Sequence, residues 1–274
     1  MLGAACGWAL LGSASLAPML ALALALSALS LLDDFRGLPV ALRFGAQVAA
    51  AGLLIWLGPP LPGGIVAAVW AVLALTWMTN LYNFMDGSNG LAGGMALFGF
   101  SFYAVAAWQA GAPGLAATSA VVAAAAAGFL LFNFHPARIF MGDGGSIPLG
   151  FLAASLGLAG WQEGRWSLIF PVLVFSPFIA DASVTLAKRL LRGDKVWQAH
   201  REHYYQRLVR MGLGHRGTAL AEYGLMMACG ISGLMILNVA STQFRLLIVA
   251  AWLTIYVLIM ISIDLAWRKQ AVEE

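Results

Sequence analysis

The chain has 274 residues, of which 61% are apolar and only 10% are Asp, Glu, Lys or Arg. An ordinary soluble domain has about 25% charged residues, so this composition excludes a soluble globule, and it also excludes disorder, which needs low hydrophobicity. Two cysteines are too few for a secreted module held together by disulfides. The composition therefore predicts a multi-pass membrane protein, folded as a single integral membrane domain over residues 1–274.

A helix that spans a membrane needs about 20 mostly apolar residues. Helices are the default in lipid, because each backbone amide must find its hydrogen-bond partner within its own segment. The predicted fold is thus an all-α polytopic membrane bundle with about nine transmembrane helices. The runs that we expect to form them are 14–32, 42–58, 65–82, 90–110, 115–134, 147–160, 167–187, 219–240 and 246–267.

The basic residues are distributed unevenly between the two ends of these runs. If the runs alternate in direction, thirteen of the fifteen Lys and Arg residues lie on one side of the membrane, and only Arg165 and Arg245 lie on the other. By the positive-inside rule, the first side faces the cytoplasm. Almost any inner-membrane protein shows this asymmetry, so the net charge of +3 gives little indication of a nucleic-acid partner.

Acidic residues gather at the ends of the runs on that same side. Asp33 and Asp34 end the first run, Asp86 follows the third and Asp143 follows the fifth. Adjacent residues on a helix diverge by about 100°, so Asp33 and Asp34 cannot share one geometry. One of them could bind a cation while the other accepts a proton or pairs with a base.

The segment 80–94 is dense in asparagine and glycine between two apolar runs. Asn80, Asn83 and Asp86 are spaced three apart, which places them on one face of a helical turn, and Asn89 follows shortly after. Amide and carboxylate oxygens that converge in this way suit a hard cation such as magnesium. The alternative is an ordinary polar turn at the membrane interface.

The segment 132–146 ends in the glycine-rich sequence Gly142-Asp-Gly-Gly-Ser146. Such a turn lets backbone N–H groups approach an anion closely, and Ser146 is expected to open the next helix as its N-cap. Asp143 would then be a lone acid beside a phosphate site that includes Gly145. This arrangement makes sense if a divalent ion bridges the carboxylate and the phosphate.

The segment 191–210 is the long hydrophilic stretch of the chain. Its His200 and His203 lie three apart, and Arg201 or Arg207 could help them to donate hydrogen bonds to a phosphate. Zinc is a poor candidate, because two histidines lack a third ligand. The alternative is a basic loop that touches anionic lipid headgroups. Together the four segments indicate phosphate-ester chemistry between a lipid substrate and a soluble substrate.

These segments resemble the ordered motifs of the polyprenyl-phosphate N-acetylhexosamine-1-phosphate transferases, glycosyltransferase family 4. The matching parts are the Asp33-Asp34 pair and the segments 80–94, 133–150 and 200–208, and the resemblance runs from about residue 15 to 267. The His-x-x-His-Tyr-Tyr-Gln-Arg sequence at 200–207 is most similar to the branch that initiates O-antigen or related surface glycans in Gram-negative bacteria.

The resemblance implies a magnesium-dependent enzyme, with manganese as a substitute, in the bacterial inner membrane with its motif loops facing the cytoplasm. Its partners would be a UDP-N-acetylhexosamine donor, undecaprenyl phosphate as the acceptor, the lipid bilayer and a second copy of the chain. The acceptor phosphate attacks the β-phosphate of the donor, which gives lipid-diphospho-sugar and UMP.

The resemblance also implies roles for individual residues, which fall into three groups. The catalytic residues would be Asp33, Asp34 and Asp86, and the magnesium ligands Asn83, Asp86 and Asp143. The substrate ligands would be Arg43, Asn80, Asn89, Gly145, His200, His203 and Arg207. Asp181 and Arg189 also fall in a pattern of this family, and the sequence leaves open whether they bind substrate or brace the bundle.

Three rival interpretations remain. Relatives usually begin earlier, with another membrane helix and a basic glycine-rich loop, whereas residues 1–32 carry no charge, so a weakly active or inactive family member is one rival. A transporter is another, because Asp181, Glu222 and Asp264 lie inside apolar runs; the other acids, however, gather at one face. A membrane prenyltransferase is the third, but it usually shows two aspartate-rich motifs and this chain has one Asp-Asp pair.

Overall fold

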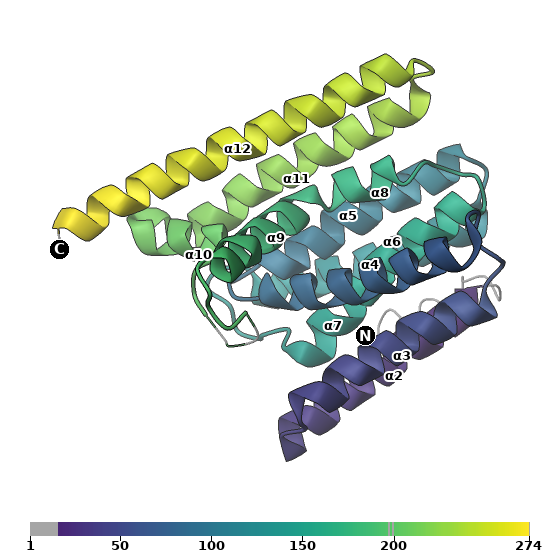
Figure 1. Ribbon diagram of the computed structural model, residues 1–274, viewed down its shortest axis with the longest axis horizontal. Coiled ribbons are helices and arrows are strands. Elements are labelled where there is room, and N and C mark those ends of the chain that lie inside the picture. The colour runs from purple at the N-terminus through teal and green to yellow at the C-terminus, as the bar shows by residue number, and fades with distance from the viewer. Residues whose placement is uncertain (1–15, 197, 199, 274) are drawn as a thin grey trace.

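The computed structural model describes residues 16–196, 198 and 200–273 (Figure 1). Within these residues all regular elements are helical, so the predicted all-α bundle is confirmed. The apolar stretch 1–13 and the first two residues of the run 14–32 lie outside the described part. The elements are α2 (Ala17–Arg36), α3 (Val40–Leu57), α4 (Gly64–Phe84), α5 (Leu91–Gln109), α6 (Pro113–Asn133), α7 (Asp143–Gln162), α8 (Ile169–Val174), α9 (Ser176–Leu191), α10 (Tyr204–Leu208), the π-helical turn η2 (Val209–Leu213), α11 (Gly214–Asn238) and α12 (Thr242–Glu273).

Eight helical segments in the described part are long and apolar enough to cross a membrane, so the chain is a multi-pass membrane protein. The run 167–187, which we expected to form one helix, forms two helices, α8 and α9, that meet at Phe175. Pro177 causes this break: it has no N–H to donate to the carbonyl of Leu173. The hydroxyl of Ser176 donates to that carbonyl instead, at 2.6 Å.

The turns between the helices gather at two opposite ends of the bundle. At one end, Gln162 donates to the carbonyl of Pro59 (3.3 Å) and Arg165 donates to that of Ala110 (3.1 Å). The loops after α2, α4, α6 and α9 lie at the other end, to the left in Figure 1. The motif-bearing segments of the sequence are therefore brought to one end, as the alternation of the runs predicts.

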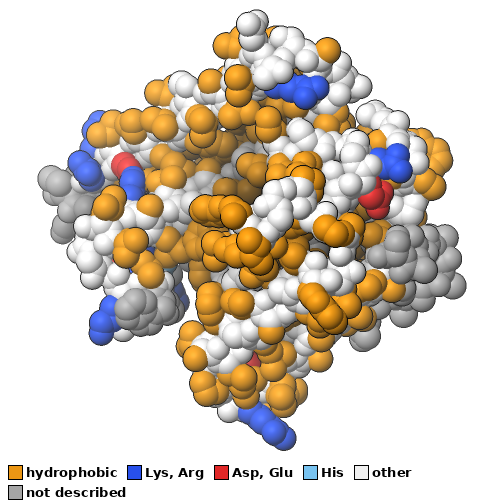
Figure 2. All heavy atoms as spheres, turned by 45° about the vertical axis from the view of Figure 1, so that its right-hand side comes forward, with side chains coloured by type: hydrophobic (Ala, Val, Ile, Leu, Met, Phe, Trp, Pro, Cys, Tyr) orange, Lys and Arg blue, Asp and Glu red, His pale blue; other side chains and the backbone are white. Residues whose placement is uncertain are grey.

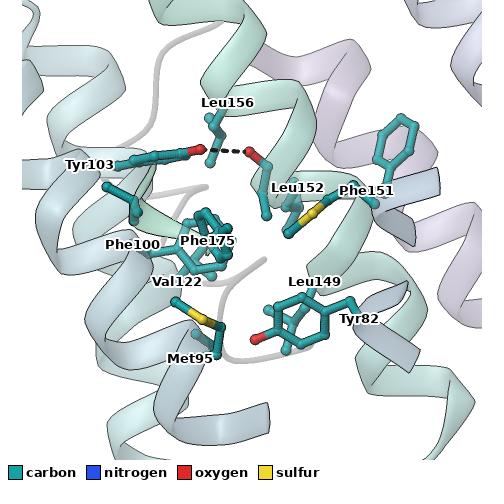
Figure 3. Close-up of a cluster of buried hydrophobic side chains, with 14 of the residues drawn as sticks. Tyr82, Met95, Phe100, Tyr103, Val122, Leu149, Phe151, Leu152, Leu156 and Phe175 are labelled. Atoms are coloured by element: carbon teal, nitrogen blue, oxygen red, sulfur yellow. Dashed lines mark hydrogen bonds between the residues drawn. The ribbon is translucent and has the colours of Figure 1, made fainter. Parts of the chain in front are cut away.

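Helices α5 and α7 form the interior of the bundle. The hydroxyl of Tyr103 on α5 donates to the carbonyl of Ala153 on α7 at 3.0 Å, beside the buried rings of Phe100 and Phe175 (Figure 3). This packing fixes α7, and α7 in turn fixes its first residue, Asp143, at the end that carries the motif loops.

The outer surface is mostly apolar, as a lipid-facing surface must be. Figure 2 shows apolar side chains over much of one face of the molecule, with few charged side chains among them. Trp56, Trp70 and Trp108 are each more than two-thirds exposed. Exposure of such large apolar side chains is unfavourable in water and favourable in lipid.

A close approach between α4 and α7 makes Gly150 sensitive to substitution. A Cβ atom at Gly150 would lie 2.6 Å from the carbonyl oxygen of Met78 and 2.7 Å from the Cβ atom of Tyr82. We expect Gly150→Ala to destabilise the folded state by about 1–3 kcal/mol, because α7 must move away from α4. Thermal unfolding in detergent measures this. Gly128→Ala on α6 is the matched control, since a Cβ atom there meets nothing within 4 Å, and an equal loss in both variants would contradict the packing argument.

Candidate active site

The Asp-Asp pair diverges as its spacing predicts. Asp33 accepts hydrogen bonds from Arg43 Nη1 (2.7 Å) and from the backbone N–H of Leu38 (2.6 Å). The side chain of Asp34 is exposed and forms no hydrogen bond or ion pair with any described residue. One carboxylate is therefore paired with a base, and the neighbouring carboxylate is free to act on a ligand.

Arg43 connects this pair to the glycine-rich turn. Its Nη1 atom lies 3.7 Å from Asp143 Oδ2, and the side chains of Asn83 and Asp34 also lie beside Asp143. Ser146 donates to Asn83 Oδ1 at 2.6 Å. Ser146 lies in the first turn of α7 and the N-cap is Gly142, so the expected N-cap role of Ser146 is wrong. The helix starts earlier because Gly142 adopts φ +61°, a conformation open to glycine.

Asp86 faces Asp143 across this site. Burial and the nearby charge of Asp143 raise the pKa of Asp86 to about 7, although the N–H of Gly142 donates to it and opposes the shift. Two carboxylates that repel each other in this way are stabilised when a cation binds between them. The Asp86 and Asp143 carboxylates therefore favour binding of a positive charge between them. The neighbouring Arg43 does not fully supply that charge.

The donor set suits a hard divalent cation. Asp86 and Asp143 offer carboxylate oxygens, and Asn83 offers the second lone pair of the amide oxygen that accepts the Ser146 hydroxyl. No three His, Cys, Asp or Glu side chains converge as a metal site anywhere in the described residues. Magnesium is commonly held by one or two carboxylates, with water and substrate phosphates completing its shell, so these residues fit magnesium better than a metal that needs a closed protein cage.

Three further residues of the predicted site lie around this centre. Asn80 lies deeper on α4, where its amide donates to Gln47 Oε1 on α3 at 2.6 Å. Asn89 lies three residues after Asp86, and its amide donates to His135. Gly145 lies in the first turn of α7, where a Cβ atom would be 2.4 Å from Met141 Cγ. Gly145 therefore allows Met141 to pack against the turn, and Asn80 joins α4 to α3.

The histidine segment lies against the Asp86 loop. The hydroxyl of Tyr205 donates to the carbonyl of Phe84 at 3.0 Å, and His203 stacks on Phe84 with ring centroids 6.2 Å apart. A Cβ atom at Gly87 would lie 2.1 Å from the Tyr205 hydroxyl oxygen. All four motif segments therefore meet at one end of the bundle.

Asp181 holds the histidine segment in place. Its carboxylate accepts the backbone N–H groups of Tyr204 (3.0 Å) and Tyr205 (2.9 Å), and it lies 3.1 Å from His203 Nδ1. Arg189 pairs with Glu202 in the same loop. The sequence left open whether Asp181 and Arg189 bind substrate or brace the bundle. In this structure both residues brace the loop that carries the histidines.

Asp181→Asn is expected to loosen the loop. The amide NH₂ of Asn would face one of the two backbone N–H groups, so a buried donor loses its acceptor, at a cost of about 1–3 kcal/mol. Faster amide hydrogen exchange at residues 203–208 measures this effect. Asp194→Asn is the control, because Asp194 lies at the surface and pairs with the exposed Arg192. Unchanged exchange in Asp181→Asn would contradict the bracing role.

The three expected phosphate ligands of this segment differ in their accessibility. The His203 side chain is only 3% exposed, and Arg207 donates to Asp264 of α12 at 2.8 Å. His200 is more open and stacks on His203. Burial and the nearby His203 lower the pKa of His200 to about 4, so its ring is neutral at pH 7. Its Nδ1 accepts the N–H of Glu202 (3.4 Å), which leaves the proton on Nε2 to donate to a ligand.

Asp264 is the residue here whose contacts the sequence did not reveal. It accepts hydrogen bonds from Lys188 and Arg207 and so joins α9 and α10 to α12. The signal was present as a single acid inside a long apolar run. Its partners lie 57 and 76 positions away, however, and no spacing rule reaches that far.

The sequence profile described as glycosyl transferase family 4 matches residues 16–160, which cover α2 to α7 and hence Asp33, Arg43, Asn83, Asp86 and Asp143. The chain belongs to glycosyl transferase family 4. The resemblance drawn from the motifs, to the polyprenyl-phosphate N-acetylhexosamine-1-phosphate transferases, is thereby confirmed.

Relatives with assigned names agree with this family. A probable undecaprenyl-phosphate N-acetylglucosaminyl 1-phosphate transferase of Bacillus subtilis is 29% identical over 249 residues, which cover 86% of this chain and 67% of the relative. A decaprenyl-phosphate N-acetylglucosaminephosphotransferase of Mycobacterium leprae is 30% identical over 72% of this chain and 58% of the relative. A phospho-N-acetylmuramoyl-pentapeptide-transferase of Staphylococcus saprophyticus is 32% identical over 54% of this chain and 46% of the relative. This chain thus spans roughly half to two-thirds of the length of these relatives.

Proposed function

We propose that the protein transfers N-acetylhexosamine 1-phosphate from a UDP-sugar to undecaprenyl phosphate, which gives a sugar-diphospho-lipid and UMP. The observation that carries this proposal is the convergence of Asp34, Arg43, Asn83, Asp86 and Asp143 at one end of a membrane bundle. The names of the relatives in Bacillus and Mycobacterium support the same reaction. The product would start O-antigen or another glycan of the cell envelope.

The reaction needs charge neutralisation and alignment more than covalent help from the protein. Magnesium bound by Asp86, Asp143 and Asn83 would neutralise charge on the donor diphosphate. Arg43 uses Nη1 for both Asp33 and Asp143 and its Nε is buried, so its Nη2 remains to donate to the lipid phosphate. Asp34, the free carboxylate, would take the proton of that phosphate, whereas Asp33 orients Arg43.

The transfer forms one bond to phosphorus and breaks another. An oxygen of the lipid phosphate forms a bond to the β-phosphorus of the donor, and the bond from that phosphorus to the oxygen shared with the α-phosphate breaks. UMP leaves with that oxygen. His200 would donate from Nε2 to the donor phosphates, and His203 and Arg207 would keep the His200 segment in place through Asp181 and Asp264.

The placement of these groups agrees with a bacterial inner-membrane protein whose motif loops face the cytoplasm. Thirteen of the fifteen basic residues lie with the site at one end of the bundle, which the positive-inside rule assigns to the cytoplasm. A water-soluble UDP-sugar would reach the site from that side. The transporter alternative is less favoured, because Asp181 and Asp264 are both bonded to the histidine segment at that end.

Release of UMP by the purified chain tests this proposal. The chain would be given undecaprenyl phosphate, magnesium and, in separate reactions, UDP-N-acetylglucosamine and UDP-N-acetylgalactosamine. We expect UMP release that requires both the lipid and the metal and stops on addition of EDTA. Release of UDP in place of UMP would overturn the proposed bond cleavage. No release with either sugar, in a chain that still binds Mn²⁺, would favour an inactive family member.

A further inference from the structure

Two histidines outside the site described so far contact the middle of the Asp86 loop. His215 Nδ1, near the start of α11, lies 2.9 Å from the hydroxyl of Ser88. His135 Nδ1, just after α6, lies 3.0 Å from the amide nitrogen of Asn89. The two rings stack on each other, with centroids 6.0 Å apart and planes inclined by 22°. Three segments distant in sequence are therefore joined by one pair of imidazoles.

The partners of the two imidazoles determine which ring nitrogens donate and accept in these contacts. An amide nitrogen donates and cannot accept, so His135 Nδ1 is the acceptor for Asn89 and the proton of a neutral His135 lies on Nε2. The Ser88 hydroxyl can donate or accept and so adapts to either tautomer of His215. Ser88 is 7% exposed, so loss of His215 would leave a buried hydroxyl without this partner.

Other contacts hold the two ends of the same loop. The N–H of Gly90 donates to Asn133 Oδ1 at 3.0 Å, and the hydroxyl of Tyr223 donates to the carbonyl of Gly90 at 2.6 Å. The Tyr205 hydroxyl donates to the carbonyl of Phe84 at the other end. Asp86 lies between these fixed ends. The histidine pair contacts Ser88 and Asn89, which are the first two residues after Asp86 that carry a side chain.

We infer that His215 and His135 are positioning residues that hold the Asp86 loop, through Ser88 and Asn89, at the separation from Asp143 that the transfer needs. This inference rests on the proposed function. The two histidines act on Asp86 through the loop. His215, Tyr205 and Tyr223 all lie beyond residue 160, so the second half of the chain, outside the span of the family profile, completes the support of the metal-binding loop.

Substitutions at both partners test this inference. His215→Phe keeps a ring to stack on His135 but cannot bond to Ser88, and Ser88→Ala removes the same bond from the other side. His215→Asn restores a polar group that can reach Ser88. Arg216→Gln, at the exposed neighbouring position, is the control. Two quantities are measured: amide hydrogen exchange in a peptide that covers residues 85–91, and UMP release as magnesium and undecaprenyl phosphate are varied separately.

We expect His215→Phe and Ser88→Ala each to raise loop exchange and to lower kcat about 10-fold or more, with a higher magnesium requirement, as loss of an outer support of a metal site does. KM for undecaprenyl phosphate should stay within about twofold, the double variant should be no worse than the singles, and His215→Asn should recover much of the loss.

Two results would overturn the inference. In the first, His215→Phe and Ser88→Ala leave both the loop exchange and the magnesium requirement equal to those of the unsubstituted chain. In the second, exchange becomes faster throughout the bundle while the magnesium requirement stays unchanged. The exchange measurement also separates this inference from the proposed function. If the unsubstituted chain releases no UMP but both substitutions loosen the 85–91 segment alone, the support by the histidines stands and the proposed reaction fails.

Discussion

Asp143→Asn is expected to lower UMP release by about 10²–10³-fold, the usual cost of removing one group that stabilises charge in a transition state. The substitution keeps the shape of the side chain and removes one of the two carboxylates that face each other across the site. Steady-state rates at saturating magnesium measure the loss. Mn²⁺ binding, followed by electron paramagnetic resonance, should weaken in parallel.

The same variant has an expected effect on the protonation of Asp86. The charge of Asp143 contributes to raising the pKa of Asp86 to about 7, so its removal should lower that pKa. In the unsubstituted chain, metal binding must displace a proton from Asp86 below about pH 7, and the metal affinity should therefore rise as the pH rises through 7. A metal affinity that is independent of pH between 6 and 8 would contradict the assignment of Asp86 as a ligand. Asp194→Asn, at the surface, should change neither quantity.

Asp34→Asn is expected to lower kcat by about 10²-fold or more, because an amide cannot accept the proton of the lipid phosphate. The KM for the UDP-sugar should change little, since Asp34 is assigned to the acceptor. Initial rates at varied concentrations of each substrate measure both quantities.

Asp33→Asn is the informative comparison for Asp34. Asp33 is bonded to Arg43 and to the backbone of Leu38, so its loss should free Arg43 and raise KM for undecaprenyl phosphate while the loop after α2 loosens. If instead Asp33→Asn abolished turnover and Asp34→Asn left it unchanged, the assignment of the two carboxylates would have to be exchanged.

The membrane fold and the meeting of the motifs could be predicted from the sequence, because both depend on patterns along the chain. Apolar runs of about 20 residues mark the helices, and their alternation places the Asp33-Asp34 pair, Asp86 and Asp143 at one end. The divergence of Asp33 and Asp34 also follows from helix geometry, and the structure shows Asp33 paired with Arg43.

The rest could not be predicted, because it depends on contacts between segments far apart in sequence. The burial of His203 against Asp181 joins positions 22 apart, and the contact of His215 with Ser88 joins positions 127 apart.

The break at Phe175 had a local signal in Pro177. Proline is tolerated in membrane helices when another group satisfies the freed carbonyl, and here the Ser176 hydroxyl does so while the helix breaks.

The fate of the β-phosphate distinguishes transfer of a sugar phosphate from transfer of the sugar alone. The purified chain would receive UDP-N-acetylglucosamine labelled with ³²P at the β-phosphate, together with undecaprenyl phosphate and magnesium, and the lipid and water phases would be separated. We expect the label to enter the lipid phase with the sugar while unlabelled UMP appears in the water phase. Label that remains in the water phase as UDP or inorganic phosphate, with sugar on the lipid, would contradict the transfer of a sugar phosphate at this site.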